Sequence, residues 1–381
     1  MGPLHGFKII EIAGIGPSQF CGMLLADMGA EILRIDRPQM SGDGITIPTK
    51  FNLMNRSRQT LSVDLKKQEG VDLVLTLCKS ADAFFEGFRP GVMERMGLGP
   101  EECLQQNRAL VYGRMTGWGQ EGPLAKTAGH DADYIALVGA LAAIGNKDQP
   151  PAIPLNLVGD FGGGGAFLAI GILAALLETS RSGEGQVVDA AMTDGAASLM
   201  TMFYGLRAGG LWSEERGSNF LDGAAPFYRS YQTRDERSVV VCALEGRFYR
   251  ELLRILSLND IDPDTQHDRS TWPTLTKRLE KTFATKTRDE WCHLFAGTDA
   301  CFTPILSMSD AITHPHNKAR NTFVEIDGIT QPAPAPRFSR SESKIKHAPP
   351  RPIKPTAAIL KAWDVPDSAV EEWLKSGTVD P

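Results

Sequence analysis

The sequence predicts an α/β protein with a large, Rossmann-like domain on an open parallel sheet, joined to a smaller α+β domain. Up to residue 200, short runs rich in β-branched residues alternate with segments of helical periodicity, as in a parallel sheet covered by helices. After residue 223 the alternation gives way to a hairpin pattern. The chain has 381 residues, 42% of them apolar, which is enough to bury two cores.

The large domain is predicted to open with a strand at residues 8–12. Pro17 suits the first turn of the helix that follows, because its missing N–H is not needed there, and this helix ends near Gly29. The further elements expected here are a strand at 31–36, a helix at 71–78 with apolar residues at i, i+3, i+4 and i+7, a strand at 83–85, a helix from 100, and strands at 109–115 and 185–190.

The small domain is predicted to begin with two strands, 227–233 and 238–243, that flank a charged turn. Helical segments at 248–256, from 272 and from 288, and a strand at 301–306, complete it. Residues 331–355 are rich in Pro, Ser, Lys and Arg, which suits an extended return segment. We therefore expect a large domain at 1–200 that is rejoined by 326–381, a linker at 201–224, and a small domain at 225–325.

Composition and motifs limit the partners. The net charge is −6 and no basic stripe is present, so we expect no nucleic-acid partner. The scattered cysteines contain no CxxC pair, which favours reduced thiols over disulfides or a zinc site. Gln19 replaces the third glycine of a GxGxxG motif that begins at Gly14, so we expect no dinucleotide cofactor. With no leader and no apolar run longer than 166–177, we expect a cytoplasmic protein without a membrane partner.

Two loop-to-helix junctions carry groups that can transfer protons. His130 precedes an apolar helical run, and Asp160 precedes four glycines and a second helix. Free N–H groups and the positive dipole end at such positions can stabilise an anion. On spacing alone, however, a hydrogen-bonded structural role for His130 and a helix-capping role for Asp160 are favoured.

Motifs along nearly the whole chain change this interpretation. They occur at residues 13–17, 34–38, 63–66, 86–92, 114–120, 128–131, 154–161, 185–190 and 221–228. In this order they resemble the α-methylacyl-CoA racemases, within the class III CoA-transferase superfamily. So many ordered matches are more specific than any single motif, and they favour catalytic roles for His130 and Asp160.

The resemblance implies roles for individual residues. His130 and Asp160 would be the two proton-transfer residues, and Glu245 in the small domain would support the histidine. Arg37 would contact the CoA phosphates with help from Arg89, since planar guanidinium groups pair well with phosphate oxygens. The segment lining the nucleotide would be Val63, Asp64, Leu65 and Lys66, and the segment bordering pantetheine and thioester would be Gly129, His130, Asp131, Ala132, Asp133 and Tyr134. For Arg56 and Arg58 we expect only a solvated surface position.

The implied reaction interconverts (2R)- and (2S)-2-methylacyl-CoA thioesters without a cofactor or metal. One group removes the α-proton on one face of the carbon and the other returns a proton on the opposite face, through an enolate. Burial beside the thioester would raise the pKa of Asp160. The resemblance also implies an interlocked homodimer, in which Glu245 reaches His130 across the interface.

The chain departs from the racemase pattern at two places. Ala132 and Asp133 stand where the family usually has Ile and Asn, and Gly246 and Arg247 follow Glu245 where it often has Pro and Gln. Two alternatives to racemisation stay open. One is a class III CoA-transferase with Asp160 as covalent nucleophile, although those enzymes generally lack the motif histidine. The other is a non-catalytic acyl-CoA binding protein.

Overall fold

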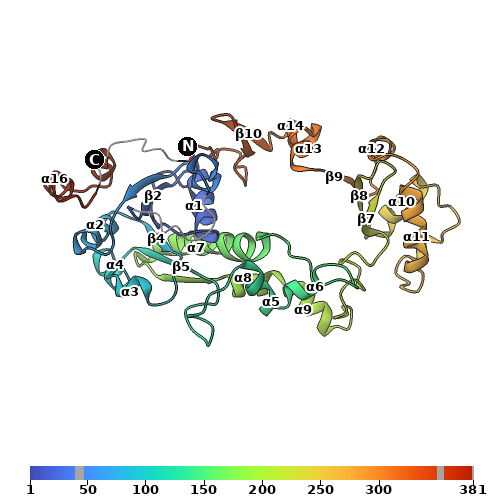
Figure 1. Cartoon of the computed structure of the whole chain (residues 1–381), viewed down its shortest axis with the longest axis horizontal. Coiled ribbons are helices and arrows are strands. Elements are labelled where there is room, and N and C mark those ends of the chain that lie inside the picture. Colours follow the sequence, from blue (N-terminus) through green and yellow to red (C-terminus); the bar gives the residue numbers. More distant parts are fainter. Residues whose placement is uncertain (39–46, 350–355, 380–381) are drawn as a thin grey trace. The chain divides into compact units, whose positions relative to one another are not determined.

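The computed structural model describes residues 1–38, 47–349 and 356–379 (Figure 1). Part of the predicted return segment, residues 350–355, and the last two residues lie outside this description. The chain divides into two compact units. The large unit comprises Met1–Val138, Leu155–Leu199 and Asn321–Pro381, and the small unit comprises Gly139–Pro154 and Met200–Arg320.

The large unit is built on a six-stranded sheet in the order β3-β2-β1-β4-β5-β6. All neighbouring strands in it run parallel, which confirms the predicted α/β class. The strands are β1 (Lys8–Ile12), β2 (Glu31–Asp36), β3 (Gln59–Ser62), β4 (Ala83–Glu86), β5 (Val111–Thr116) and β6 (Val187–Ala191). β3 was not predicted, because its short, largely polar sequence buries only Leu61. The strand order reverses between β1 and β4, and ligands of open α/β sheets bind at such a point.

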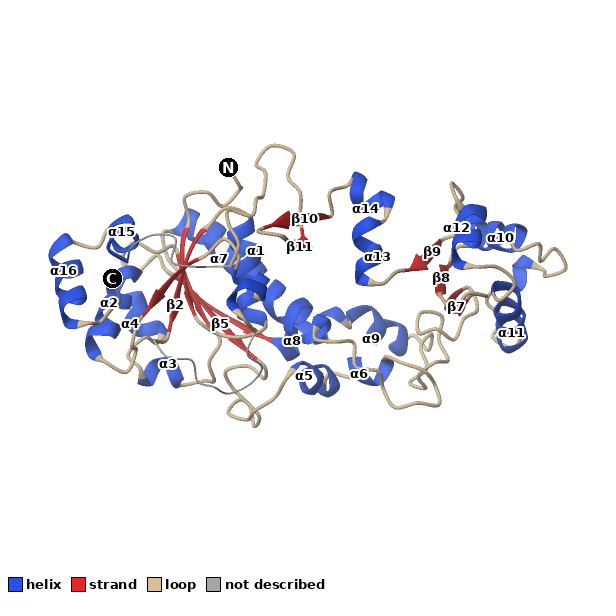
Figure 2. Cartoon of the chain, turned by 45° about the horizontal axis from the view of Figure 1, so that its top comes forward, coloured by secondary structure: helices blue, strands red, loops and turns tan. Residues whose placement is uncertain are grey.

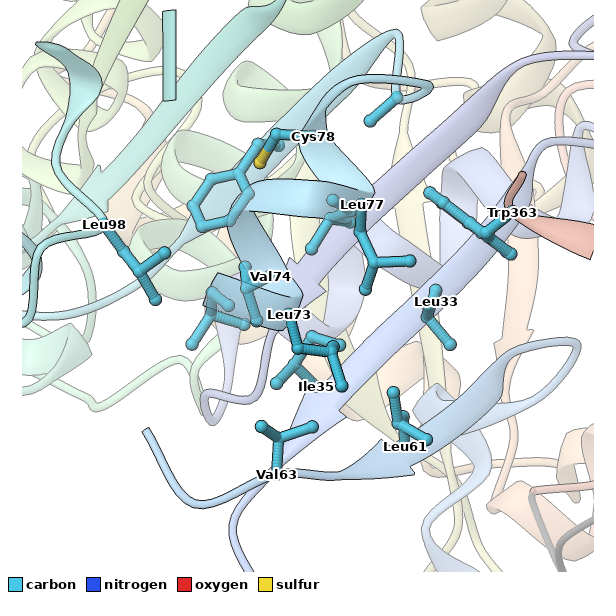
Figure 3. Packing of buried hydrophobic residues seen from close by; sticks show 14 of the residues in the cluster. Leu33, Ile35, Leu61, Val63, Leu73, Val74, Leu77, Cys78, Leu98 and Trp363 are labelled. Carbon is cyan, nitrogen blue, oxygen red and sulfur yellow. The ribbon is translucent and has the colours of Figure 1, made fainter. Parts of the chain in front are cut away.

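Helices cover both faces of this sheet (Figure 2). The helices of the large unit are α1 (Pro17–Asp27), α2 (Gln68–Cys78), α3 (Val92–Arg95), α4 (Pro100–Gln106), α5 (Asp131–Leu137), α7 (Phe167–Ser182), α8 (Met192–Leu199), α15 (Thr356–Ala362) and α16 (Asp367–Ser376), with short 3-10 turns η1 (Thr49–Phe51) and η2 (Leu53–Asn55). Ile9 packs with α1 and α7, whereas Ile10 packs with α2 and the C-terminal helices, because successive strand side chains point to opposite faces. Figure 3 shows the second cluster, in which Trp363 joins Leu33 and Leu77.

A π-helical segment, η3 (Leu157–Ala166), continues directly into α7. The resulting helix, Leu157–Ser182, has 26 residues and is long and apolar enough to cross a membrane by length and composition alone. It is longer than the apolar run at 166–177 because glycine-rich residues extend it. A core helix of a soluble protein passes the same test, and here Leu168 and Ile172 are fully buried against the sheet.

The small unit contains an antiparallel sheet in the order β7-β8-β9 with helices packed on it, which is the predicted α+β arrangement. Its elements are β7 (Tyr228–Gln232), β8 (Ser238–Cys242), β9 (Phe302–Ile305), α6 (Ala140–Ala143), α9 (Thr201–Ala208), α10 (Gly246–Ile255), η4 (Pro263–Thr265), α11 (Trp272–Phe283), α12 (Arg288–Phe295), α13 (Met308–Thr313) and α14 (Pro315–Ala319). Residues 201–224, expected as a linker, begin with α9. The large unit also contains an unpredicted hairpin of β10 (Phe323–Ile326) and β11 (Ile329–Pro332), whose half-exposed strands are only four residues long.

A buried ionic cluster lies beneath α1. Glu11 on β1 is fully buried and accepts hydrogen bonds from Arg58 and from Arg34 Nη1 (2.7 Å), its neighbour in register on β2. Arg58 also donates to the carbonyl of Gln19 (2.9 Å). Gly22 leaves room for this pair, because a Cβ there would lie 2.6 Å from both Arg58 Nη1 and Glu11 Oε2.

The expectation of a solvated position was wrong for both Arg56 and Arg58, because both side chains are buried. Arg56 Nη2 lies 2.5 Å from Oδ2 of Asp27. Charged side chains are buried in this way only when they are paired, and the pairing partners lie far away in sequence.

Replacing Glu11 by Gln should lower the free energy of unfolding by about 3 kcal/mol, because two arginines would stay buried around an uncharged group. Urea unfolding followed by circular dichroism measures this loss. Glu184→Gln is the matched control in the same unit, since the Arg108–Glu184 pair is exposed and should cost less than about 1 kcal/mol. Equal losses in the two variants would contradict the importance assigned to the buried cluster.

Candidate active site

The loops that follow β1 and β4 meet where the strand order of the large unit reverses. Ser18, in the first turn of α1, is buried and its hydroxyl lies directly against Gly87, where any Cβ would collide with it. Gly16 is the N-cap of α1 and has φ +59°, a conformation that glycine adopts without strain. The first turn of α1 is therefore in contact with the loop after β4.

The glycines of η3 allow unusually close packing against α1 and α8. A Cβ at Gly163 would lie 2.6 Å from the backbone nitrogen of Ala196 on α8. A Cβ at Gly164 would lie 2.8 Å from Met192 and 3.0 Å from Pro17. Because side chains at these positions would hold the helices apart, the glycine run brings the first turn of η3 to the start of α1. Departures from α-helical geometry of this kind are frequent at functional sites.

Asp160 lies in that first turn of η3. A Cβ on Gly16 would be 3.0 Å from Asp160 Oδ2, which places the carboxylate next to the N-terminus of α1. The same oxygen accepts a hydrogen bond from Asn156 Nδ2 (3.0 Å), and the backbone N–H of Asp160 donates to Asp131 Oδ1 (2.6 Å).

The pKa of Asp160 is raised, in the direction expected from the sequence. Burial is the largest cause, and the negative charge of Asp131 adds to it. The hydrogen bond from Asn156 and the charge of His130 act in the opposite direction. Sequence reasoning missed Asn156 as a partner of Asp160, although an amide four residues before the aspartate was a visible signal.

His130 is the N-cap of α5 and its side chain is exposed. Its backbone N–H donates to Oδ2 of Asp133 (2.9 Å), the third residue of α5, whose carboxylate accepts this bond as in a capping box. The carboxylate by which the chain departs from the racemase pattern therefore fixes the backbone of His130.

Tyr134 anchors the loop before His130. Its hydroxyl donates to the carbonyl of Gly129, and its ring packs edge-on against Trp118 with a centroid distance of 4.8 Å. Burial raises the pKa of Tyr134 to about 12, so the phenol stays protonated as a donor. Gly117 and Gly129 lack side chains where this ring passes, and a Cβ at either position would overlap it.

The segment predicted to line the nucleotide lies beside Arg37. The N–H of Val63 donates to the carbonyl of Asp36 (2.8 Å), so residues 63–66 and Arg37 leave adjacent strands at the same edge of the sheet. The guanidinium-bearing residue Arg37 is exposed. Within the segment, Val63 is buried, Asp64 and Leu65 are half-buried, and Lys66 is exposed. The structure thus brings these sequence-predicted residues together.

Arg89 is exposed in the loop after β4, and Glu86 holds that loop. Glu86 Oε2 accepts the N–H of Phe88 (2.6 Å), and Oε1 lies 3.4 Å from Nε of Arg114. Burial is the main cause that raises the pKa of Glu86 to about 7. Sequence reasoning included Glu86 in the motif at 86–92 but missed this role of the last residue of the otherwise apolar β4.

Glu245 belongs to the small unit. It is the N-cap of α10 and its side chain is exposed. Its carbonyl accepts the N–H groups of Phe248 and Tyr249 (3.0 Å each), while the guanidinium of Arg247 stacks 4.4 Å from the ring centre of Phe248. Among the residues that the structure describes, no group of three or more His, Cys, Asp or Glu side chains is placed to hold a metal ion.

Residues 4–354 match CoA-transferase family III. Alpha-methylacyl-CoA racemase from Mus musculus is 44% identical over 340 residues, which are 89% of this chain and 87% of the mouse protein. Alpha-methylacyl-CoA racemase from Homo sapiens is 41% identical over 334 residues, which are 87% of this chain and 86% of the human protein. The crystal structure of a CAIB/BAIF family protein from Brucella suis superposes with a TM-score of 0.80 at 25% identity, covering 95% of this chain and all of that one. The chain therefore belongs to CoA-transferase family III.

Proposed function

We propose that this protein is an α-methylacyl-CoA racemase, which interconverts (2R)- and (2S)-2-methylacyl-CoA thioesters. The observation that carries the proposal is the link between the two junctions that bear proton carriers. Asp160 has a raised pKa, and its backbone is hydrogen-bonded to the residue that follows His130. The similarity to two proteins named alpha-methylacyl-CoA racemase supports the same conclusion.

In the proposed reaction, His130 and Asp160 act on opposite faces of the α-carbon. One removes the α-proton, which gives an enolate, and the other returns a proton on the opposite face. The raised pKa of Asp160 favours the protonated form that must donate in one direction. N–H groups aimed at the enolate oxygen would stabilise it, and the reaction needs no cofactor or metal.

The thioester substrate is bound along the carboxyl ends of the strands. Arg37 and Arg89 are exposed beside the loops after β2 and β4, where their guanidinium groups can meet the CoA phosphates. Residues 63–66 line the nucleotide, and residues 129–134 border pantetheine and thioester.

We further propose that the protein acts as an interlocked homodimer. The stretch Leu155–Leu199 exposes several large apolar side chains, and exposed apolar surface of this kind marks interaction sites. They are Leu155, Leu157, Ile170, Leu177, Val187 and Leu199. Val187 lies on β6, an edge strand of the sheet, which offers a further surface for a partner. In this dimer Glu245 of each chain supports His130 of the other, in a cytoplasmic enzyme that binds neither nucleic acid nor membrane.

Replacing either His130 or Asp160 by Ala should abolish interconversion of the two epimers, because inversion needs a group on each face. Exchange of the α-proton with solvent should survive for one epimer only, and the two variants should retain opposite epimers. Mass spectrometry of 2-methylacyl-CoA after incubation in heavy water measures this uptake, with circular dichroism as the control for folding.

The rival activities give different outcomes in the same experiment. A CoA-transferase would move CoA to free carboxylates without exchanging the α-proton, and would lose that transfer in Asp160→Ala but keep it in His130→Ala. A binding protein would retain the thioester with neither exchange nor transfer. Either result with the wild-type chain would refute racemisation.

Arg37→Ala should raise KM by about tenfold and change kcat much less, because a phosphate contact is made equally before and during the reaction. Steady-state exchange kinetics with a CoA thioester separates the two constants. Arg108→Ala is the control, since Arg108 is also exposed but precedes β5, at the amino end of the sheet. An unchanged KM for Arg37→Ala would place the phosphates elsewhere.

A further inference from the structure

Asp131 is a buried carboxylate between the two proposed proton carriers. It is the first residue of α5 and only 5% exposed. Its Oδ1 accepts the backbone N–H of Asp160 at 2.6 Å, across 29 residues of sequence. Its Oδ2 is buried and has no hydrogen-bond partner among the described residues. Burying a carboxylate with only one backbone N–H as its partner costs free energy of folding, which points to a role beyond packing.

The residue before Asp160 is shaped by this contact. A Cβ at Gly159 would lie 2.7 Å from Asp131 Oδ1 and 2.9 Å from Asp131 Cγ. Any side chain at position 159 would therefore push the carboxylate away from the N–H of Asp160. The glycine keeps open the path along which Asp131 reaches η3.

We infer that Asp131 is a positioning residue of the proposed racemase, which fixes the backbone of Asp160 relative to His130 through its carboxylate. The inference rests on the proposed function. It assigns separate tasks to the two acidic residues in the first turn of α5. Asp133 accepts the N–H of His130, and Asp131 accepts the N–H of Asp160. One helical turn thereby holds the backbones of both proton carriers.

Asp131 also acts on Asp160 through its charge. The titratable groups that face Asp160 are Asp131, whose charge raises the pKa of Asp160, His130, whose charge lowers it, and Tyr134. Besides α5 and the continuing α7, the elements α1, α8, β5 and β6 pack against η3. Their charged residues are Asp27, Asp194, Arg114 and Asp189, and none of these is among the groups that shift the pKa of Asp160. The groups that α1 and α8 bring against the glycines of η3 are Pro17, Phe20, Met192, Gly195, Ala196 and Leu199, all of them uncharged. Asp131 is thus the one negative charge from a neighbouring element that acts on Asp160 within the described residues.

The variant Asp131→Asn separates the two effects, because the amide oxygen still accepts the N–H of Asp160 while the charge is lost. The pH profile of α-proton exchange should then move in a defined direction. Removing a negative charge lowers the pKa of Asp160, so the limb that reports its titration should shift to lower pH, by about one unit, whichever form is reactive. Asp131→Ala also loses the acceptor, and its kcat should fall by roughly ten- to a hundredfold with little change in KM.

Asp82→Asn is the matched control. Asp82 also accepts a backbone N–H from a distant residue, that of Lys8 at 2.7 Å, but Lys8 begins β1 and so lies at the opposite end of the strand from Gly16. This variant should leave the pH profile in place. If Asp131→Ala keeps its kcat as Asp82→Asn does, or if Asp131→Asn does not fold while Asp82→Asn does, Asp131 is a structural residue and the inference is overturned.

A second measurement does not depend on racemase activity. Carbon-13 NMR of protein labelled at the aspartate carboxyl carbons, with Asp160→Asn to assign the signal, gives the titration midpoint of Asp160 directly. The midpoint should fall in Asp131→Asn and stay unchanged in Asp82→Asn. A shifted midpoint in a protein that exchanges no α-proton would refute the proposed function but support the electrostatic link between Asp131 and Asp160. An unshifted midpoint in an active protein would refute that link alone.

Discussion

The distance between backbones at the glycine run of η3 is the constraint on which the site depends. The segment packs against α8 so closely that the carbonyl of Gly163 lies on Gly195, and against α1 so closely that Gly165 meets the carbonyl of Pro17. Side chains at these positions would separate the helices by the width of at least one methyl group. Asp160 would then no longer lie beside Gly16, and its burial, which is the main cause of its raised pKa, would be lost.

Other glycines around the site also allow close contacts that a side chain would prevent. Gly117 and Gly129 make room for Tyr134, and Gly87 makes room for Ser18. Each glycine lets a polar or aromatic side chain reach a backbone or loop that it could not otherwise touch. Rigid support of this kind matters for proton transfer, because the rate depends steeply on the placement of the acid and the base.

Much of this arrangement could be predicted from the sequence, and the exceptions share a physical cause. Apolar, β-branched runs predict buried strands such as β1 and β2, and residues such as Pro17 predict the start of a helix. The strand β3 and the hairpin β10–β11 are short and half-exposed, so they carry little periodicity. The glycines of η3 have low helix propensity, and tertiary packing overrides it. His130 and Asp160 could be placed at helix starts, but the bond from Asp160 to Asp131 joins residues far apart in sequence, and no local pattern encodes such a contact.

The way in which the C-terminal segment completes the large unit bears on how the protein is made. Ile359, Leu360 and Trp363 belong to the same buried cluster as α2, and Val379 pairs with Val63 at the start of the proposed nucleotide segment. During synthesis, residues 63–66 therefore emerge from the ribosome long before Val379, and the apolar cluster on this face of the sheet stays incomplete until residues 356–379 follow. A nascent chain with exposed apolar surface of this kind is a natural client for chaperones. Loss of the final helices would remove the pairing of Val379 with Val63 and thereby loosen the proposed nucleotide segment.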